Sequence, residues 1–174
     1  MASDTIFHTI APRPCRPTFR PLADDLVAGL GDLLAALEAS GEAQAFHPHA
    51  FDRRTLESLC RPPAGPHDEY RVAVEDRRVV AYGMLRGWAE GYAVPSLGIA
   101  VHPAARGRGL ARSTMAYLHD VARGRGATRV RLKVYRNNAT AVHLYRSLGY
   151  RLEPLNEQEF VGFLELGRQE ESAA

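Results

Sequence analysis

The stretch from residue 97 to residue 112 constrains the fold of this chain more than any other. It reads Leu-Gly-Ile-Ala-Val-His-Pro-Ala-Ala-Arg-Gly-Arg-Gly-Leu-Ala-Arg. An apolar run ends at Pro103, two glycines follow, and a helical pattern then begins. A strand that turns through glycines into a helix leaves unpaired backbone N–H groups at the positive end of the helix dipole. The sequence therefore predicts an anion site at this turn, suited to a phosphate.

The side chains of the turn support a phosphate ligand. Gly107 and Gly109 have no Cβ, so backbone can approach a ligand closely at both positions. Arg106, Arg108 and Arg112 add guanidinium groups that match phosphate oxygens. A second Arg-Gly-Arg-Gly at residues 123–126 ends the same helical pattern, so we expect it to be a helix cap and not a second phosphate site.

Two common phosphate loops do not fit this stretch. A nucleoside-triphosphate loop needs Lys and then Ser or Thr after its last glycine, and neither follows Gly109. A dinucleotide fingerprint needs a third glycine where Arg112 stands, and an acidic residue about 20 residues further on. The downstream strand at residues 129–134 is instead basic. What remains is Arg-x-x-Gly-x-Ala, from Arg106 to Ala111.

Two further motifs complete this pattern. Asn138-x-x-Ala141 is followed by Leu-Tyr-x-x-Leu-Gly-Tyr at residues 144–150. With these motifs, residues 68–151 resemble the GCN5-related N-acetyltransferase (GNAT) superfamily. The resemblance implies an α/β (α+β) fold: a strongly bent, mixed, mainly antiparallel sheet flanked by helices, with a splayed strand pair at the cofactor site. It also implies an acetyl-CoA-dependent N-acetyltransferase.

The resemblance assigns the residues that hold coenzyme A. Backbone amides of the glycine turn would bind its pyrophosphate, and the strand before the turn would pair with its pantetheine arm. Asn137 and Asn138 could each cap the next helix, and the motif spacing selects Asn138 as the cofactor contact. The expected cofactor-binding residues are Ile99, Ala100, Val101, Arg106, Gly107, Arg108, Gly109, Leu110, Ala111, Arg112, Asn138, Ala141 and Tyr145.

Tyr145 is the expected general acid. A phenol can donate a proton to a departing thiolate, and the matching tyrosine of the family does so. From spacing alone, the alternative for Tyr145 is a half-buried aromatic on a helix face, which is the less favoured of the two interpretations. The expected mechanism is direct transfer in a ternary complex, with the Ile99 N–H binding the oxyanion.

The general base is harder to assign. An amine is protonated near neutral pH and must lose a proton before it attacks. The strand at residues 96–101 has no carboxylate, which departs from one variant of the family. Glu90, just before that strand, is our first choice for the base, and His49 is the second.

Composition limits the class of protein. The chain has 174 residues, which suits one domain, and a formal net charge of +2. It has no uninterrupted apolar run of about 18 residues and no signal-peptide pattern, so we expect a cytoplasmic protein without a membrane span. His47 and His49 lack a clear third ligand, so we expect no metal site. We expect a flexible leader at 1–17, one domain at 18–168 and a frayed tail at 169–174.

Periodicity and turn residues predict the elements of this domain. Asp24 or a neighbour and Asp52 are the expected caps of the first two helices. Helices are expected at 24–41, 52–61, 108–122 and 138–148, the second of them stopping before Pro62. Strands are expected at 18–22, 70–74, 79–85, 92–101, 128–134, 150–152 and 159–166.

Several functions stay open at this point. A small-molecule amine is the favoured acceptor, and Phe46, Trp88 and Tyr92 could line its pocket. A protein N-terminal or ribosomal-protein acetyltransferase and a non-catalytic acyl-CoA-binding module are the alternatives. We expect no nucleic-acid partner, because the arginines are interleaved with a cofactor pattern and lack an aromatic stacking array. The resemblance also allows a homodimer.

Overall fold

A computed structural model describes residues 16–41, 46, 48–61 and 64–167. The leader up to residue 15 and the tail at 169–174 lie outside these residues. The helices are α1 (Val27–Ala39), α2 (Arg53–Leu59), α3 (Leu110–Gly124) and α4 (Ala139–Ser147), with short 3-10 helices η1 (Asp24–Leu26) and η3 (Pro103–Ala105). The strands are β1 (Thr18–Pro21), β2 (Glu69–Glu75), β3 (Arg78–Arg86), β4 (Ser96–Val101), β5 (Arg129–Tyr135), β6 (Arg151–Pro154) and β7 (Glu159–Glu165).

The strands form one seven-stranded sheet in the order β1-β2-β3-β4-β5-β7-β6. Every neighbouring pair is antiparallel except β4 and β5, which are parallel. These two strands pair only at Ser96 and Arg131, so their ladder stops near the start of β4. The expected mixed, mainly antiparallel sheet is confirmed, and β4 and β5 are its splayed pair.

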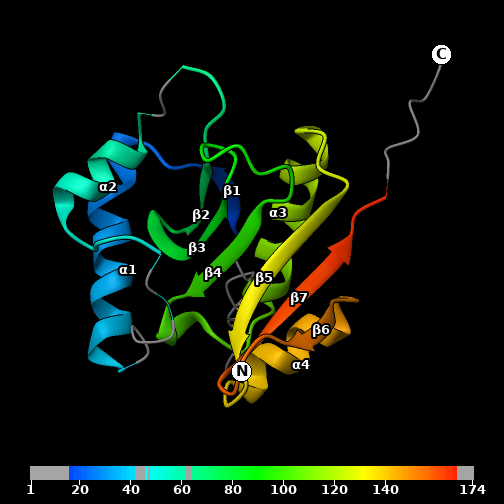
Figure 1. Ribbon diagram of the computed structural model, residues 1–174. Coiled ribbons are helices and arrows are strands. Elements are labelled where there is room, and N and C mark those ends of the chain that lie inside the picture. Colours follow the sequence, from blue (N-terminus) through cyan, green and yellow to red (C-terminus); the bar gives the residue numbers. More distant parts are fainter. Residues whose placement is uncertain (1–15, 42–45, 47, 62–63, 168–174) are drawn as a thin grey trace, which may run out of the picture.

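Helices cover both faces of the sheet (Figure 1). Helices α1 and α2 pack on one face, where Leu30, Leu33 and Leu34 meet Val72 and Tyr82. Helices α3 and α4 pack on the other face and share an apolar core with β5. That core includes Met115, Leu118, Leu132, Val142 and Tyr145. No helix in the described ranges is both long and apolar enough to cross a membrane.

The two predicted aspartate caps have different outcomes. Asp52 caps α2 as predicted, because its Oδ1 accepts a hydrogen bond from the Thr55 N–H at 2.9 Å. For the first helix, the expected cap was Asp24 or a neighbour, and Asp24 itself is not the N-cap. Asp24 is the first residue of η1 and pairs with Arg61, while Leu26 occupies the N-cap position of α1 without a side-chain cap.

The strand before the glycine turn and the helix after it both begin later than predicted. The strand expected from residue 92 begins at Ser96, because the turn that ends at residue 91 is followed by a bend at residues 93–94. The helix expected from residue 108 begins at Leu110, because Gly109 has the left-handed conformation with φ +77°. The helix ends at Gly124, and Gly126 has φ +80°, which confirms that the second Arg-Gly-Arg-Gly is a cap.

Candidate active site

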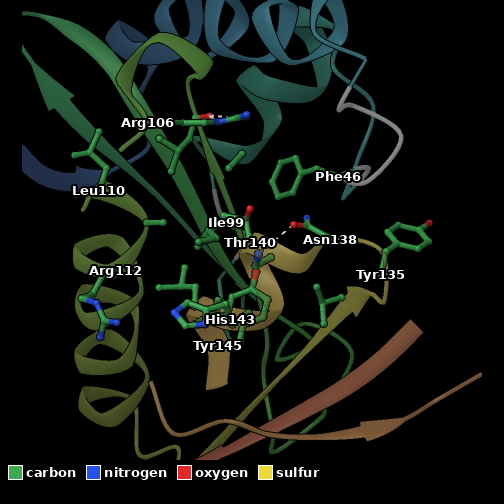
Figure 2. Close-up of a pocket in the computed structure, with 18 of the residues that line it drawn as sticks. Phe46, Ile99, Arg106, Leu110, Arg112, Tyr135, Asn138, Thr140, His143 and Tyr145 are labelled. Atoms are coloured by element: carbon green, nitrogen blue, oxygen red, sulfur yellow. Dashed lines mark hydrogen bonds between the residues drawn. The ribbon is translucent and has the colours of Figure 1, made fainter. Parts of the chain in front are cut away.

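A cavity of about 840 Å³ opens where β4 and β5 separate. The start of α3 and one side of α4 form further walls, and Figure 2 shows side chains from these elements directed toward a common space. All the expected cofactor-binding residues except Arg108 line this cavity. The sequence motifs therefore meet in space although they are far apart in the chain.

The open edge of β4 faces this cavity. The ladder between β3 and β4 places the His102 N–H on the Val80 carbonyl, and hydrogen-bonded pairs alternate along an antiparallel ladder. The N–H and C=O groups of Ile99 and Val101 therefore point away from β3, toward β5. Since β5 pairs with β4 only at Ser96, the N–H groups of Ile99 and Val101 and the Ile99 carbonyl are available to a ligand lying in the gap, whereas the Val101 carbonyl accepts from Arg106.

The glycine turn lies at the end of this edge. Gly107 and Gly109 have φ of +73° and +77°, and a Cβ added at either would meet no atom within 4 Å. The turn is tied back to β4, because the Arg106 guanidinium donates to the Val101 carbonyl. The backbone N–H groups in the first turn of α3 have no intrahelical acceptor. The turn is thus an open cradle of amides beside positive side chains.

Arg108 has a different role from the one predicted. Its guanidinium donates to the Glu75 carboxylate at 2.7 Å, and the Glu75 side chain is only 8% exposed. This ion pair fastens the glycine turn to β2 and directs Arg108 away from the cavity. Arg112, in contrast, lines the cavity and donates to the Ser147 hydroxyl at 2.6 Å, which joins α3 to α4.

These two arginines should therefore respond differently to substitution. Arg108→Gln leaves the buried Glu75 carboxylate without its cation, so we expect the free energy of unfolding to fall by about 2 kcal/mol. Arg112→Gln should barely change stability but weaken the affinity for coenzyme A several-fold. Urea unfolding and calorimetric titration of both variants check this contrast, and a weaker affinity in Arg108→Gln at unchanged stability would contradict it.

Asn138 and Tyr145 lie on α4, across the cavity from the turn (Figure 2). Asn138 caps α4, because its Oδ1 accepts from the Ala141 N–H at 3.1 Å, and it also lines the cavity. Tyr145 is 8% exposed, and burial raises the pKa of its phenol to about 12. The phenol is therefore protonated at neutral pH and can act as a donor.

The sequence comparison agrees with this geometry. The profile of the acetyltransferase (GNAT) family matches residues 34–150, which is more than half of the chain. The chain belongs to the GNAT family. Among curated proteins, no sequence matches it significantly.

Solved GNAT structures share this fold. A GCN5-related N-acetyltransferase from Kribbella flavida is 25% identical, with a TM-score of 0.70, 86% of this chain and 98% of that chain covered. The PaiA N-acetyltransferase of Thermoplasma acidophilum, solved with coenzyme A, is 13% identical, with a TM-score of 0.72 and the same coverage. The ribosomal-protein-S18-alanine N-acetyltransferase of Escherichia coli is 20% identical, with a TM-score of 0.64 and 91% and 99% covered.

A buried pair lies behind Tyr145 in this GNAT protein. His119 of α3 shares a 2.8 Å hydrogen bond with the Tyr150 hydroxyl, and the Tyr150 ring lies 5.8 Å from the Tyr145 ring. Burial, with a smaller contribution from Arg123, lowers the pKa of His119 to about 4. His119 is therefore neutral at physiological pH, and the pair supports the inner side of the Tyr145 ring.

The lowered pKa of His119 predicts acid sensitivity. Because the folded pKa of about 4 lies below the ordinary 6.5, the unfolded chain gains a proton first as the pH falls. Stability from this residue is complete above pH 6.5 and declines toward pH 4. His119→Gln can keep a hydrogen bond to Tyr150 but does not titrate, so its unfolding free energy should fall less over this range. An identical pH dependence in urea unfolding would contradict this assignment.

The expected acceptor residues are only partly brought together. Phe46 lines the cavity and packs edge-on against the buried Tyr82. His49 contacts the same tyrosine, with a 2.8 Å hydrogen bond between its Nε2 and the Tyr82 hydroxyl, and burial lowers the pKa of His49. Neither Trp88 nor Tyr92 lines the cavity; Trp88 lies under the Arg125 guanidinium, and Tyr92 is exposed.

Glu90, our first choice for the base, is not at this site. It lies exposed in the turn between β3 and β4, at the end of β4 where β4 still pairs with β5. The glycine turn is at the opposite end of that strand, and the cavity is lined by β4 from Leu97 to Val101 but not by Glu90. His49 is closer, but its imidazole is engaged with Tyr82 and the Ala50 carbonyl and does not line the cavity.

Sequence reasoning missed several residues of the cavity. Thr140, Leu144 and Ser147 are spaced by about one helical turn on α4, so the helix period could have identified them. Lys133 and Tyr135 alternate with the buried residues of β5 and could have been assigned to its other face. Glu159 comes from β7, and only the pairing of β7 with β5 brings it here.

Proposed function

We propose that this GNAT protein transfers the acetyl group of acetyl-CoA to a primary amine of a small molecule, by direct attack in a ternary complex. One observation carries the proposal: a single cavity joins the glycine turn, the open edge of β4 and Tyr145. Two substrates bound side by side in this space would gain much of the rate from proximity.

The residues of the cavity fit coenzyme A. The open cradle at Gly107 and Gly109 suits a pyrophosphate, with Arg106 and Arg112 on its border. The free edge of β4 at Ile99 and Val101 suits the amides of a pantetheine arm. The solved structure of the Thermoplasma protein with coenzyme A supports the same ligand here.

Acetyl-CoA, when bound, supplies an activated acetyl thioester. We assign the Ile99 N–H, which faces the gap, to bind the carbonyl oxygen as negative charge develops on it. We assign Tyr145 to donate a proton or hydrogen bond to the departing sulfur, since its raised pKa keeps the phenol protonated. No cysteine is among the described residues that line the cavity, which favours direct attack over an acyl-cysteine route.

The acceptor side of the cavity supports a small molecule. Leu37 of α1 and Phe46 form part of one wall, and the Phe46 ring packs edge-on against the buried Tyr82. The Escherichia coli neighbour acts on a ribosomal-protein alanine, so a polypeptide amine is the rival acceptor.

Thiol release from acetyl-CoA tests the proposal. We would assay amino sugars, aminoglycosides, polyamines, amino acids and short peptides, with calorimetry for acetyl-CoA binding. Release with a small amine supports the proposal, and release with peptides alone supports the rival. Binding of acetyl-CoA without release from any amine would favour a binding module, and absence of binding would overturn our assignment of the glycine turn.

A further inference from the structure

Glu159 supplies a negative charge to an otherwise basic cavity. Among the described residues that line the cavity, it carries the only carboxylate, whereas Arg106, Arg112 and Lys133 are positive. The two arginines lie at the cradle for phosphates, so their charge is explained by coenzyme A. A carboxylate is unfavourable for an anionic cofactor and requires a different explanation.

The sheet register places Glu159 opposite Tyr145. Glu159 pairs with Tyr135, and paired residues of an antiparallel ladder point to the same face of a sheet. Val134, the neighbour of Tyr135, belongs to the core under α3 and α4, so Tyr135 and Glu159 face the other side. Tyr145 approaches from α4. The cavity is therefore lined by a proton donor on one face and by a carboxylate on the other.

The turn before β7 holds Glu159 in a defined position. The Asn156 Oδ1 accepts from the N–H groups of Gln158 and Glu159, both at 2.8 Å. The Asn156 amide then donates to Glu159 Oε2 at 3.0 Å. A carboxylate has about four acceptor positions, so this single contact leaves capacity for an ammonium group. The carboxylate is thus preorganised and retains capacity for a cation.

Lys133 lies diagonally from Glu159 on the same face. It pairs with Val161, two residues along β7 from Glu159, and such diagonal neighbours are about 7 Å apart. Lys133 is exposed and lines the cavity as well. A second positive charge on an acceptor would be repelled here, whereas an anionic group would be attracted.

We propose that Glu159 binds the ammonium group of the acceptor and that Lys133 binds an anionic group of the same molecule. The acceptor is then an amino-acid-like zwitterion with one primary amine and one carboxylate. This inference rests on the proposed acetyl transfer and adds the class of acceptor. It also provides the carboxylate that the strand at residues 96–101 lacks.

The protons balance in this arrangement. The bound ammonium gives one proton to the Glu159 carboxylate, which releases that proton to solvent, and the free amine then attacks the thioester carbonyl carbon. The C–N bond forms and the C–S bond breaks. The nitrogen loses a second proton, and the leaving sulfur gains one from Tyr145, which recovers a proton through solvent. The products are an N-acetyl amino acid, coenzyme A thiol and one proton.

Matched acceptors test the charge requirement. We would measure kcat/KM by thiol release for a set of amino acids, their carboxamides, which lack the anionic group, and the polyamine spermidine. Wild-type protein should prefer an amino acid over its carboxamide by about fivefold, the size expected for an exposed charge pair, and should use spermidine least.

Matched variants test the two residues. Glu159→Gln should raise KM for every amine at least about tenfold, with the affinity for acetyl-CoA unchanged by calorimetry. Glu157→Gln, in the same turn but outside the cavity lining, is its control and should behave as wild type. Lys133→Gln should remove the preference for the amino acid over its carboxamide. Arg131→Gln is its control and should retain the preference, because Arg131 lies two residues earlier on the same face of β5 but does not line the cavity.

The outcomes separate this inference from the proposed function. Turnover of amines with equal use of carboxamides, or with Glu159→Gln unaltered, would overturn the inference while acetyl transfer stands. Binding of acetyl-CoA without turnover of any amine would overturn both. Two results together support the inference: a preference for the zwitterion that depends on Lys133, and a raised KM in Glu159→Gln but not in Glu157→Gln.

Discussion

Replacing Gly109 by Val should weaken acetyl-CoA binding by at least about 100-fold, because a branched side chain cannot hold this turn and would displace charge-assisted amide bonds to the phosphates. Gly109 has φ +77° and is the N-cap residue of α3. A Cβ there would meet no protein atom within 4 Å, and Gly109 lines the cavity, so the added side chain would enter space that we assign to the cofactor. Calorimetric titration with acetyl-CoA measures the change.

Gly126 provides the matched control for this variant. It has φ +80°, it also follows an arginine in an Arg-Gly-Arg-Gly sequence, and an added Cβ would again meet nothing within 4 Å. Gly126→Val should therefore incur similar backbone strain, about 1–2 kcal/mol, without altering the affinity for acetyl-CoA. Equal losses of affinity in the two variants would mean that strain, and not the cradle, controls binding.

Replacing Tyr145 by Phe should lower kcat about 100-fold and leave the affinity for acetyl-CoA within about twofold of wild type, because the substitution removes a proton donor but keeps the ring. The ring packs against Tyr150 at 5.8 Å and needs no hydroxyl for this contact. Since the pKa of Tyr145 is raised to about 12, its phenol should stay protonated across the pH range of an ordinary assay.

Tyr135→Phe is the control for this substitution. Tyr135 lines the same cavity from β5 and undergoes the same chemical change, but it lies on the face of the sheet away from α4. Its kcat should fall far less than that of Tyr145→Phe. Steady-state kinetics with a saturating amine compares the two variants, and an unchanged kcat in Tyr145→Phe would remove the role that we assign to the phenol.

The local sequence determined the parts of this protein that depend on short-range spacing. The order Gly-x-Gly and then a helical pattern was enough to predict the glycine turn at the start of α3. Positive φ and unpaired N–H groups are properties of a few consecutive residues. The local sequence left Asn137 and Asn138 both possible as the cap of α4, and the resemblance to the GNAT family selected Asn138, which is the cap in the structure.

Tertiary structure alone decided where the charges act. Arg108 and Arg112 are both arginines at the glycine turn, and the sequence gives no reason to treat them differently. Contact with Glu75, 33 residues earlier, directs Arg108 away from the cavity. Glu90 is near β4 in sequence and yet lies at the wrong end of it, whereas Glu159 reaches the cavity through the pairing of β7 with β5. Strand register joins residues that are distant in the chain, and no local pattern specifies which ones. The glycine turn could therefore be predicted from the sequence. The residues that we assign to the acceptor could be placed only by the pairing of the strands.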